Sequence, residues 1–153
     1  MRMCAKLAPV VSFAIVAAGL AFAQSELPPG SPQLINPEEL VKALQAPTGE
    51  KPLILNVGPS LLYMQAHIPG AEYIGSASTP QGAQALRSRV KTLPKSIYIV
   101  LYCGCCPWSH CPNVRPAFHE LQKLGFSNVK VLYIADNFGT DWVDKGYPTI
   151  KGQ

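Results

Sequence analysis

Three stretches of this chain are nearly continuous runs of apolar, strand-forming residues: 53–57, 97–102 and 129–134. They lack the regular alternation of apolar and polar residues that marks a strand with one face in water. Stretches with apolar residues at helical spacing lie between the runs. Buried strands that alternate with helices indicate a parallel sheet covered on both faces. We therefore predict an α/β fold of three layers.

Capping residues place the predicted helices between these strands. Side chains such as Asn, Ser and Thr at a helix start accept hydrogen bonds from free backbone N–H groups. The expected helices and caps are 37–45 after Asn36, a helix after Ser78 or Thr79, and 114–124 after Asn113. Gly125 is expected to end the last helix. A strand at 72–74 and a short helix around Trp142 complete the predicted elements.

The strand at 97–102 leads into a loop that holds four of the five cysteines. They are Cys103, Cys105, Cys106 and Cys111. Ligands of open parallel sheets bind at the carboxyl ends of the strands. A thiol-dense loop at such an end, followed by a helix N-terminus, indicates sulfur chemistry.

The first 23 residues have the composition of an export signal. Arg2 and Lys6 form a short basic start, and an uncharged apolar segment leads to the small-x-small pattern at 21–23. We predict cleavage after Ala23 and a periplasmic or secreted location, with no stable membrane span after cleavage. Such compartments are oxidising. The predicted organisation is a signal peptide at 1–23, a flexible lead-in at 24–33 and one domain at 34–153.

Composition and charge exclude two classes of protein. The chain is 48% hydrophobic and only 14% charged, which excludes general disorder. The net charge is +4, and Arg2 and Lys6 in the predicted signal supply two of these charges. No basic stripe interleaves with aromatic residues, so we expect no nucleic-acid partner.

Several segments carry motifs that are similar to those of one protein family. They are His67-Ile-Pro-Gly-Ala71, Ile99-Val-Leu-Tyr-Cys103, Leu121-Gln-Lys-Leu-Gly-Phe126 followed by Val129, and Trp142 to Pro148. Together they resemble the single-domain rhodaneses, a family of sulfurtransferases, over about residues 34–150. The resemblance implies a rhodanese-like three-layer fold with a parallel central sheet flanked by helices. His67 and Trp142 are expected to be structural.

The sequence departs from the family pattern near the expected site. Asn56-Val57-Gly58 stands where the family usually has Asp-Val-Arg. Ser109 falls at the place of the family's Ser or Thr, but Trp108 stands where its Arg is expected. The loop is also longer and holds three extra cysteines, so its chemistry is expected to differ from ordinary thiosulfate chemistry.

The resemblance implies that Cys103 is the nucleophile. Backbone N–H groups and a helix N-terminus stabilise the thiolate, which is the reactive form of cysteine. The expected cycle is an attack on a small sulfane-sulfur donor, a persulfide on Cys103, and transfer to a thiol or other acceptor. No cofactor is expected for this cycle.

Other loop residues have expected supporting roles around Cys103. Gly104 would let the backbone approach the sulfur closely, and Arg115 would attract an anionic donor. His110 would either shuttle a proton or simply line the loop. Trp108 would be either a pocket wall or a core plug.

The remaining cysteines leave two pairings open. Cys103 and Cys106 form a C-x-x-C pair, so Cys106 could resolve a persulfide on Cys103 and make the protein a sulfur relay with a periplasmic redox partner. A static disulfide between Cys106 and Cys111 would instead hold the lengthened loop. A disulfide between adjacent Cys105 and Cys106 is disfavoured because it strains the peptide.

Two further hypotheses belong to different functional classes. The first is a site for Cu(I) or Zn(II), because soft metal ions prefer thiolate and imidazole ligands. Its candidate ligands are Cys103, Cys105, Cys106, Cys111 and His110, although their spacing matches no recognised zinc finger. The second is a non-catalytic rhodanese-fold binding module, in which all four loop cysteines would be permanently paired.

Overall fold

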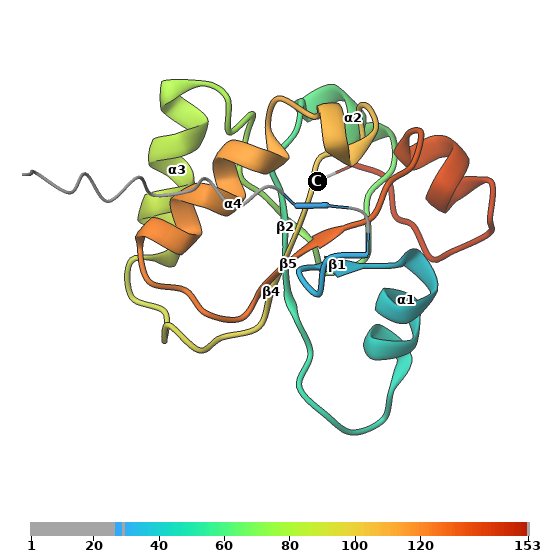
Figure 1. Ribbon diagram of the computed structural model, residues 1–153. Helices are drawn as coiled ribbons and strands as arrows, with labels where there is room; N and C mark the ends of the chain where they lie inside the picture. The colour runs from blue at the N-terminus through green and yellow to red at the C-terminus, as the bar shows by residue number, and fades with distance from the viewer. Residues whose placement is uncertain (1–26, 29, 153) are drawn as a thin grey trace, which may run out of the picture.

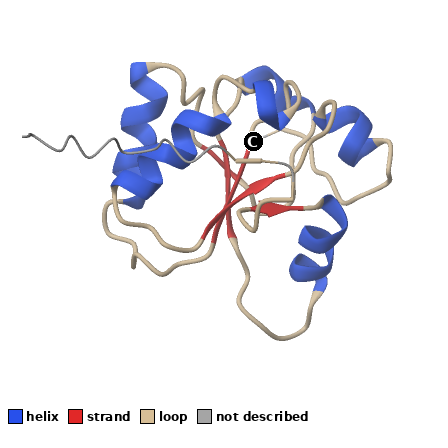
Figure 2. Ribbon diagram, viewed as in Figure 1, coloured by secondary structure: helices blue, strands red, loops and turns tan. Residues whose placement is uncertain are grey.

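The computed structural model describes residues 27–28 and 30–152, and a parallel sheet of five strands forms its centre. The strands are β1 (Leu34–Ile35), β2 (Leu53–Asn56), β3 (Glu72–Tyr73), β4 (Ile99–Tyr102) and β5 (Val129–Leu132). Their order across the sheet is β1-β5-β4-β2-β3, so β4 lies in the middle. Figures 1 and 2 show this sheet surrounded by helices. The predicted α/β fold with a parallel central sheet is confirmed.

Helices cover both faces of the sheet. They are α1 (Pro37–Gln45), α2 (Ser60–Gln65), α3 (Pro80–Val90), η1 (Trp108–His110), α4 (Val114–Lys123) and η2 (Gly139–Val143). The α3 and α4 helices pack on one face, and α1, α2 and η2 pack on the other. Successive side chains of β4 alternate between these layers. Leu101 and Cys103 belong to the α3 and α4 side, whereas Val100 and Tyr102 belong to the opposite side.

The α4 helix begins and ends as the sequence predicts, within one residue. Its buried side chains include Val114, Phe118 and Leu121, which lie on one stripe. Full burial of such a side chain contributes about 1.5–3 kcal/mol. Gly125 has a φ of +86° and donates its N–H to the Gln122 carbonyl at 2.9 Å, which ends the helix.

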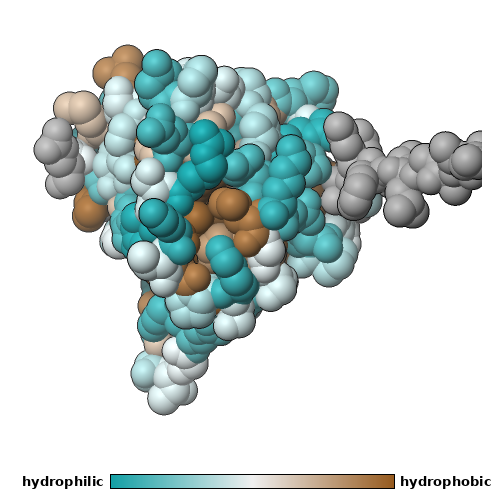
Figure 3. Space-filling model, turned by 90° about the vertical axis from the view of Figure 1, so that its left-hand side faces the viewer, coloured by the Kyte–Doolittle hydropathy of each residue, from teal (hydrophilic) through white to brown (hydrophobic). Residues whose placement is uncertain are grey.

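The face of the molecule in Figure 3 is mainly hydrophilic, with a small apolar area near its middle.

Short elements are where structure and prediction differ. The β1 strand and the α2 helix were not predicted, because an edge strand of two residues and a helix of six carry almost no periodic signal. The strand predicted at 97–102 begins at Ile99, and the one predicted at 129–134 ends at Leu132. The short helix expected around Trp142 is a single π-helical turn.

His67 and Trp142 occupy structural positions in the second layer. His67 is 1% exposed, its Nδ1 lies 2.8 Å from the Tyr63 carbonyl oxygen, and its ring stacks on the Tyr63 ring. Its backbone also forms an antiparallel bridge with Ile150. Trp142 is fully buried and donates its Nε1–H to the Pro148 carbonyl at 2.9 Å. The bridge between His67 and Ile150 attaches the tail of the chain to the segment between α2 and β3, and the Trp142 bond closes the tail on itself.

The predicted signal peptide at 1–23 and its cleavage site lie outside the described residues. Within the predicted lead-in at 24–33, the side chain of Leu27 packs into the α3 and α4 side of the core. The Ser31 N–H donates to the Pro28 carbonyl at 2.9 Å, which forms a turn. Part of the lead-in therefore belongs to the packed domain. Across the described residues, no helix combines the length and apolar character that crossing a membrane requires.

Candidate functional site

Cys103 lies directly after β4, at the carboxyl end of the central strand. The neighbouring strand β2 runs parallel to β4, and the Val57 N–H donates to the Tyr102 carbonyl at 2.9 Å. Both neighbours of β4 are parallel strands, so the carboxyl ends of the three meet at one edge of the sheet. The strand-end position predicted for Cys103 is the one that the structure has.

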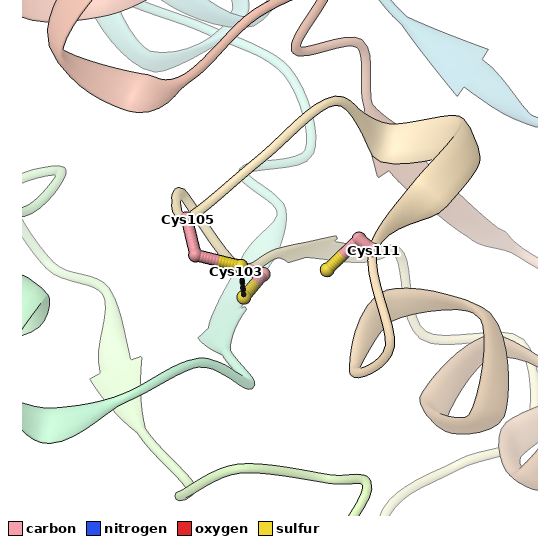
Figure 4. Close-up of side chains that lie close together, drawn as sticks. All are labelled: Cys103, Cys105 and Cys111. Carbon is pink, nitrogen blue, oxygen red and sulfur yellow. Dashed lines mark hydrogen bonds between the residues drawn. The ribbon is translucent and has the colours of Figure 1, made fainter.

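Three sulfur atoms converge at this point. The Sγ atoms of Cys103, Cys105 and Cys111 all lie within 4.8 Å of one another, and those of Cys103 and Cys105 are 3.2 Å apart. Figure 4 shows the Cys111 sulfur directed toward this pair. Cys106 Sγ lies 2.9 Å from Cys105 Sγ, outside the group of three. The structure has all four loop cysteines as free thiols, and a hydrogen bond joins Cys106 to Cys111. The disulfide considered between Cys106 and Cys111 stays a prediction.

Asn113 holds the Cys103 sulfur and does not cap α4. Its backbone is in the helical region and its side chain makes no capping hydrogen bond, so the predicted cap is wrong. Its side-chain oxygen instead accepts from the Ser78 N–H at 3.0 Å and from the Ser78 hydroxyl at 2.7 Å. Its Nδ2 donates to Cys103 Sγ at 3.4 Å. Because Asn113 is only 4% exposed, these partners satisfy a buried amide.

Gly58 leaves the space in which the Cys103 sulfur lies. A Cβ at Gly58 would be 2.8 Å from Cys103 Sγ and 2.6 Å from the Cys103 carbonyl oxygen, closer than side chains can approach. The buried Asn56 side chain accepts from the Gly58 N–H at 3.1 Å and holds this turn. Asn56 and Gly58 are therefore site residues, although the sequence singled them out only as departures from the family pattern.

Hydrogen bonds set the charge of the Cys103 and Cys111 pair. A hydrogen bond from Cys103 and the backbone N–H groups of Val114 and Asn113 lower the pKa of Cys111 to about 6, although burial opposes them. Donation to Cys111, together with burial, raises the pKa of Cys103 above its usual value. Burial and a contact with Cys105 raise the pKa of Cys106 to about 12. These contacts therefore favour the thiolate form at Cys111 and the thiol form at Cys103.

The other predicted loop residues are divided between the core and the surface of the protein. Trp108 is 6% exposed, and its backbone N–H donates to the Ile134 carbonyl, so its side chain is part of the core. Trp108 also lines a pocket together with Ser109 and Arg115. None of the four described cysteines lines that pocket. His110 is exposed, and its Nδ1 lies 3.0 Å from the Ser109 hydroxyl. Ser109 and Arg115 line that pocket, and His110 is not part of the group of three sulfurs.

Access to the sulfurs differs sharply among the thiols. Cys103 and Cys111 are 3% and 2% exposed, and the space of about 170 Å³ beside them has no room for a water molecule. Cys105 is half-buried and lines a separate groove of about 360 Å³ with Gly104 and apolar side chains that include Phe138. Gly104 has a φ of +89°, which suits glycine, and its carbonyl accepts from the Phe138 N–H. Cys105 is thus the thiol of the group of three that faces an opening.

Comparisons with known proteins agree with this arrangement. The sequence model of the family described as "Rhodanese-like domain" matches residues 36–133. The crystal structure of the Alr3790 protein from Anabaena sp. is similar, with a TM-score of 0.59 and 21% identity over 77% of this chain and 92% of that chain. A rhodanese-like domain protein from Staphylococcus aureus has a TM-score of 0.51 and 16% identity over 79% of this chain and 99% of that chain. None of the curated proteins matches the chain.

The two kinds of match support different statements. Identities of 21% and 16% show that the fold is shared and carry no residue role. The family model covers more than half of the chain, from Asn36 through β4 to Tyr133, and includes the whole cysteine loop. The chain belongs to the rhodanese-like domain family.

Proposed function

We propose that the protein takes up sulfane sulfur as a persulfide on Cys103 and passes it to a thiol or other acceptor. The observation that carries the proposal is the position of the Cys103 sulfur at the carboxyl end of β4. There, Asn113 Nδ2 and the Cys105 backbone N–H both donate hydrogen bonds to it. Such donors stabilise a thiolate and a persulfide anion. We propose that this takes place in the periplasm or outside the cell.

The first step is nucleophilic attack by Cys103 on the donor. Cys103 gives its proton to Cys111, with which it shares a hydrogen bond, and its sulfur attacks the outer sulfur of the donor. The donor's sulfur–sulfur bond breaks, and the leaving group departs with the electron pair, as sulfite from thiosulfate or as a thiolate from a persulfide. In the second step an acceptor thiolate attacks the outer sulfur of the Cys103 persulfide, which restores Cys103.

The surroundings favour a donor whose transferred sulfur belongs to an organic sulfur chain over thiosulfate, in which that sulfur is bonded to a charged sulfonate group. Trp108 stands where the family has an Arg, and it is built into the core. The groove beside Cys105 is lined mainly by apolar side chains. We therefore propose an organic persulfide or organic polysulfide as the donor class. The buried Cys103 becomes accessible when the loop opens toward this groove.

The test is sulfur uptake by the reduced protein. Protein of residues 24–153 is mixed with glutathione persulfide, or separately with thiosulfate, and the released glutathione or sulfite is measured. We expect one leaving group for each protein molecule, a larger yield with the persulfide, and loss of the reaction in Cys103→Ser. Equal release by wild type and Cys103→Ser, or release by neither, would refute the proposal.

A second candidate function is binding of a soft metal ion, and the convergence of three sulfurs favours it. Cys103, Cys105 and Cys111 could supply three thiolates to Cu(I) or Zn(II), whereas His110 lies outside the group. The check is competition with a Cu(I) or Zn(II) chelator of known affinity under anaerobic conditions. Stoichiometric retention by wild type and His110→Ala, with loss in Cys105→Ser, supports a metal site. Complete loss to the chelator from wild type excludes it.

A further inference from the structure

Cys103 and Cys111 form a buried pair of thiols that come from opposite ends of the loop. Cys103 directly follows β4 and Cys111 precedes α4, with seven residues between them. Their Sγ atoms lie within 4.8 Å of each other, and Figure 4 shows the Cys111 sulfur directed toward Cys103. A disulfide needs its two sulfurs about 2 Å apart. A small movement of the two side chains would therefore join them.

We infer that Cys111 resolves the persulfide on Cys103 and releases its outer sulfur as hydrosulfide. The protein would then reduce sulfane sulfur, in addition to binding it. This inference rests on the proposed function, because it starts from the Cys103 persulfide. It assigns a product, hydrosulfide, and a second reacting thiol to the same site.

The reaction balances within the protein. Cys111 passes the proton that it received from Cys103 to the outer sulfur of the persulfide anion. The resulting Cys111 thiolate attacks Cys103 Sγ of the protonated persulfide, and a disulfide bond forms between Cys103 and Cys111. The bond between Cys103 Sγ and the outer sulfur breaks, and the outer sulfur leaves with its proton and the electron pair as hydrosulfide. The two cysteine sulfurs are oxidised while the sulfane sulfur is reduced. The Asn113 and Val114 N–H groups donate hydrogen bonds to Cys111 Sγ and hold the attacking atom in place.

The geometry favours Cys111 over the other two thiols. Cys106 Sγ contacts Cys105 Sγ and shares a hydrogen bond with Cys111, but it is not part of the group around Cys103. Cys105 Sγ is close to Cys103 Sγ, but Gly104 alone separates these two residues, so the disulfide ring would be small and strained. Gly104 is also held in place, because its carbonyl accepts from the Phe138 N–H at 3.1 Å. Of the three thiols, only Cys111 both lies near Cys103 Sγ and is separated from Cys103 by enough residues to form an unstrained disulfide.

A second turnover requires an external dithiol reductant, which would reduce the disulfide by thiol–disulfide exchange. The groove of about 360 Å³ beside Gly104 opens next to the pair, and it is lined mainly by apolar side chains. Cys105 lines this groove and its sulfur lies 3.2 Å from Cys103 Sγ. A dithiol protein that docks there would meet Cys105 beside the buried disulfide.

The experiment follows one turnover without added reductant. Reduced protein of residues 24–153 receives one equivalent of glutathione persulfide under anaerobic conditions. Released glutathione, released sulfide, intact mass and disulfide-linked peptides are measured together. For wild type we expect one glutathione and one sulfide per protein, a mass lower by two hydrogen atoms, and a peptide linked through Cys103 and Cys111.

Two matched variants separate Cys111 from Cys106. Cys111→Ser should still release glutathione but lose sulfide release, and it should retain the mass of one added sulfur on Cys103. Cys106→Ser should behave as wild type. A stable persulfide in wild type, or loss of sulfide release in Cys106→Ser with retention in Cys111→Ser, would overturn the inference while the proposed function stands. Absence of glutathione release from wild type would refute the proposed function itself. If Cys111→Ser fails to fold, the linked peptide of wild type decides alone.

Discussion

At the scale of single residues, the site depends on what surrounds one sulfur atom. Gly58, which follows β2, leaves room for Cys103 Sγ, and Asn113, which precedes α4, donates a hydrogen bond to this sulfur. Neither residue type is chemically reactive. Both act by position, because a Cβ at Gly58 or a missing amide at Asn113 would change where the sulfur lies. The reactivity of Cys103 is therefore tested most directly through these neighbours.

Gly58→Ala should disable the site. The new Cβ would lie 2.8 Å from Cys103 Sγ and 2.6 Å from a backbone oxygen that cannot move freely. Overpacking of this kind costs about 1–3 kcal/mol. We expect a lower urea midpoint and loss of sulfur uptake. Ser60→Ala, an exposed substitution two residues away, is the control and should leave both unchanged. Normal uptake by Gly58→Ala would show that the contact is not required.

Asn113→Ala should destabilise the protein by about 1–3 kcal/mol, because Ser78 and Cys103 would lose their buried partner. Urea unfolding measures the loss. Ser78→Ala removes only the hydroxyl donor and keeps the backbone one, so its cost should be smaller. Equal costs for the two variants would contradict the proposed network.

At the scale of elements, the cysteine loop connects β4 to α4, and the surroundings of its cysteines differ between its two ends. Cys103 lies at the carboxyl end of a strand, whereas Cys111 lies where free backbone N–H groups begin α4. Trp108, midway between them, is buried in the core and anchors the loop through Ile134. The anchored loop thus holds two thiols in different electrostatic environments.

The environment of Cys111 predicts a thiolate that titrates near pH 6. The thiolate absorbance of the reduced protein should rise by one equivalent with a midpoint of about 6, and Cys111→Ser should abolish this step. The folded pKa lies below the ordinary thiol value of 9.0, so the folded state binds fewer protons between these values. Stability from Cys111 should therefore rise with pH through this window and be lost as pH falls through about 6. A midpoint near 9 in the folded protein would contradict the prediction.

At the scale of the whole molecule, the tail closes the second layer of the fold. Trp142 is fully buried, and its ring stacks on Phe138, which also holds Gly104. The tail therefore contacts the cysteine loop through Phe138, which stacks on Trp142 and donates its N–H to Gly104. Substitutions that disrupt the packing of the tail should therefore lower the free energy of unfolding and disturb the cysteine loop.

Trp142→Ala should lower the free energy of unfolding by about 3–5 kcal/mol, because it leaves a large cavity. Guanidinium unfolding monitored by circular dichroism measures this loss. Val143→Ala, at an exposed neighbouring position, should change stability by less than about 0.5 kcal/mol. A small effect of Trp142→Ala would mean that the tail is not part of the cooperative unit.

Export of the chain remains a prediction at this scale. Expressed with its first 23 residues in a Gram-negative host, the protein should appear in the periplasmic fraction with Gln24 at its N-terminus. Ala23→Lys should block cleavage and leave a longer product, because the signal-peptidase site requires a small residue there. Cytoplasmic recovery of the uncleaved wild type would contradict the prediction.

The sequence alone determined the architecture and the position of the nucleophile candidate. Apolar strands, helix caps and Gly125 are local signals, so four of the five strands, together with α1, α3 and α4, could be predicted to within a few residues, whereas β1 could not. Cys103 followed from its place at the end of such a strand. The family resemblance rested on the same local segments, and the match to residues 36–133 confirms it.

Only the tertiary structure decided which residues surround that nucleophile. Ser78 and Asn113 are 35 positions apart, and Asn56 and Cys103 are 47 apart, so no local pattern could pair them. Asn113 has the sequence signature of a cap, but a buried sulfur and Ser78 compete for its amide. The same packing places Cys111, and not Cys106, in the group of three sulfurs with Cys103, and His110 is not part of that group. Side-chain contacts of this kind depend on how distant elements pack, which local sequence signals do not encode.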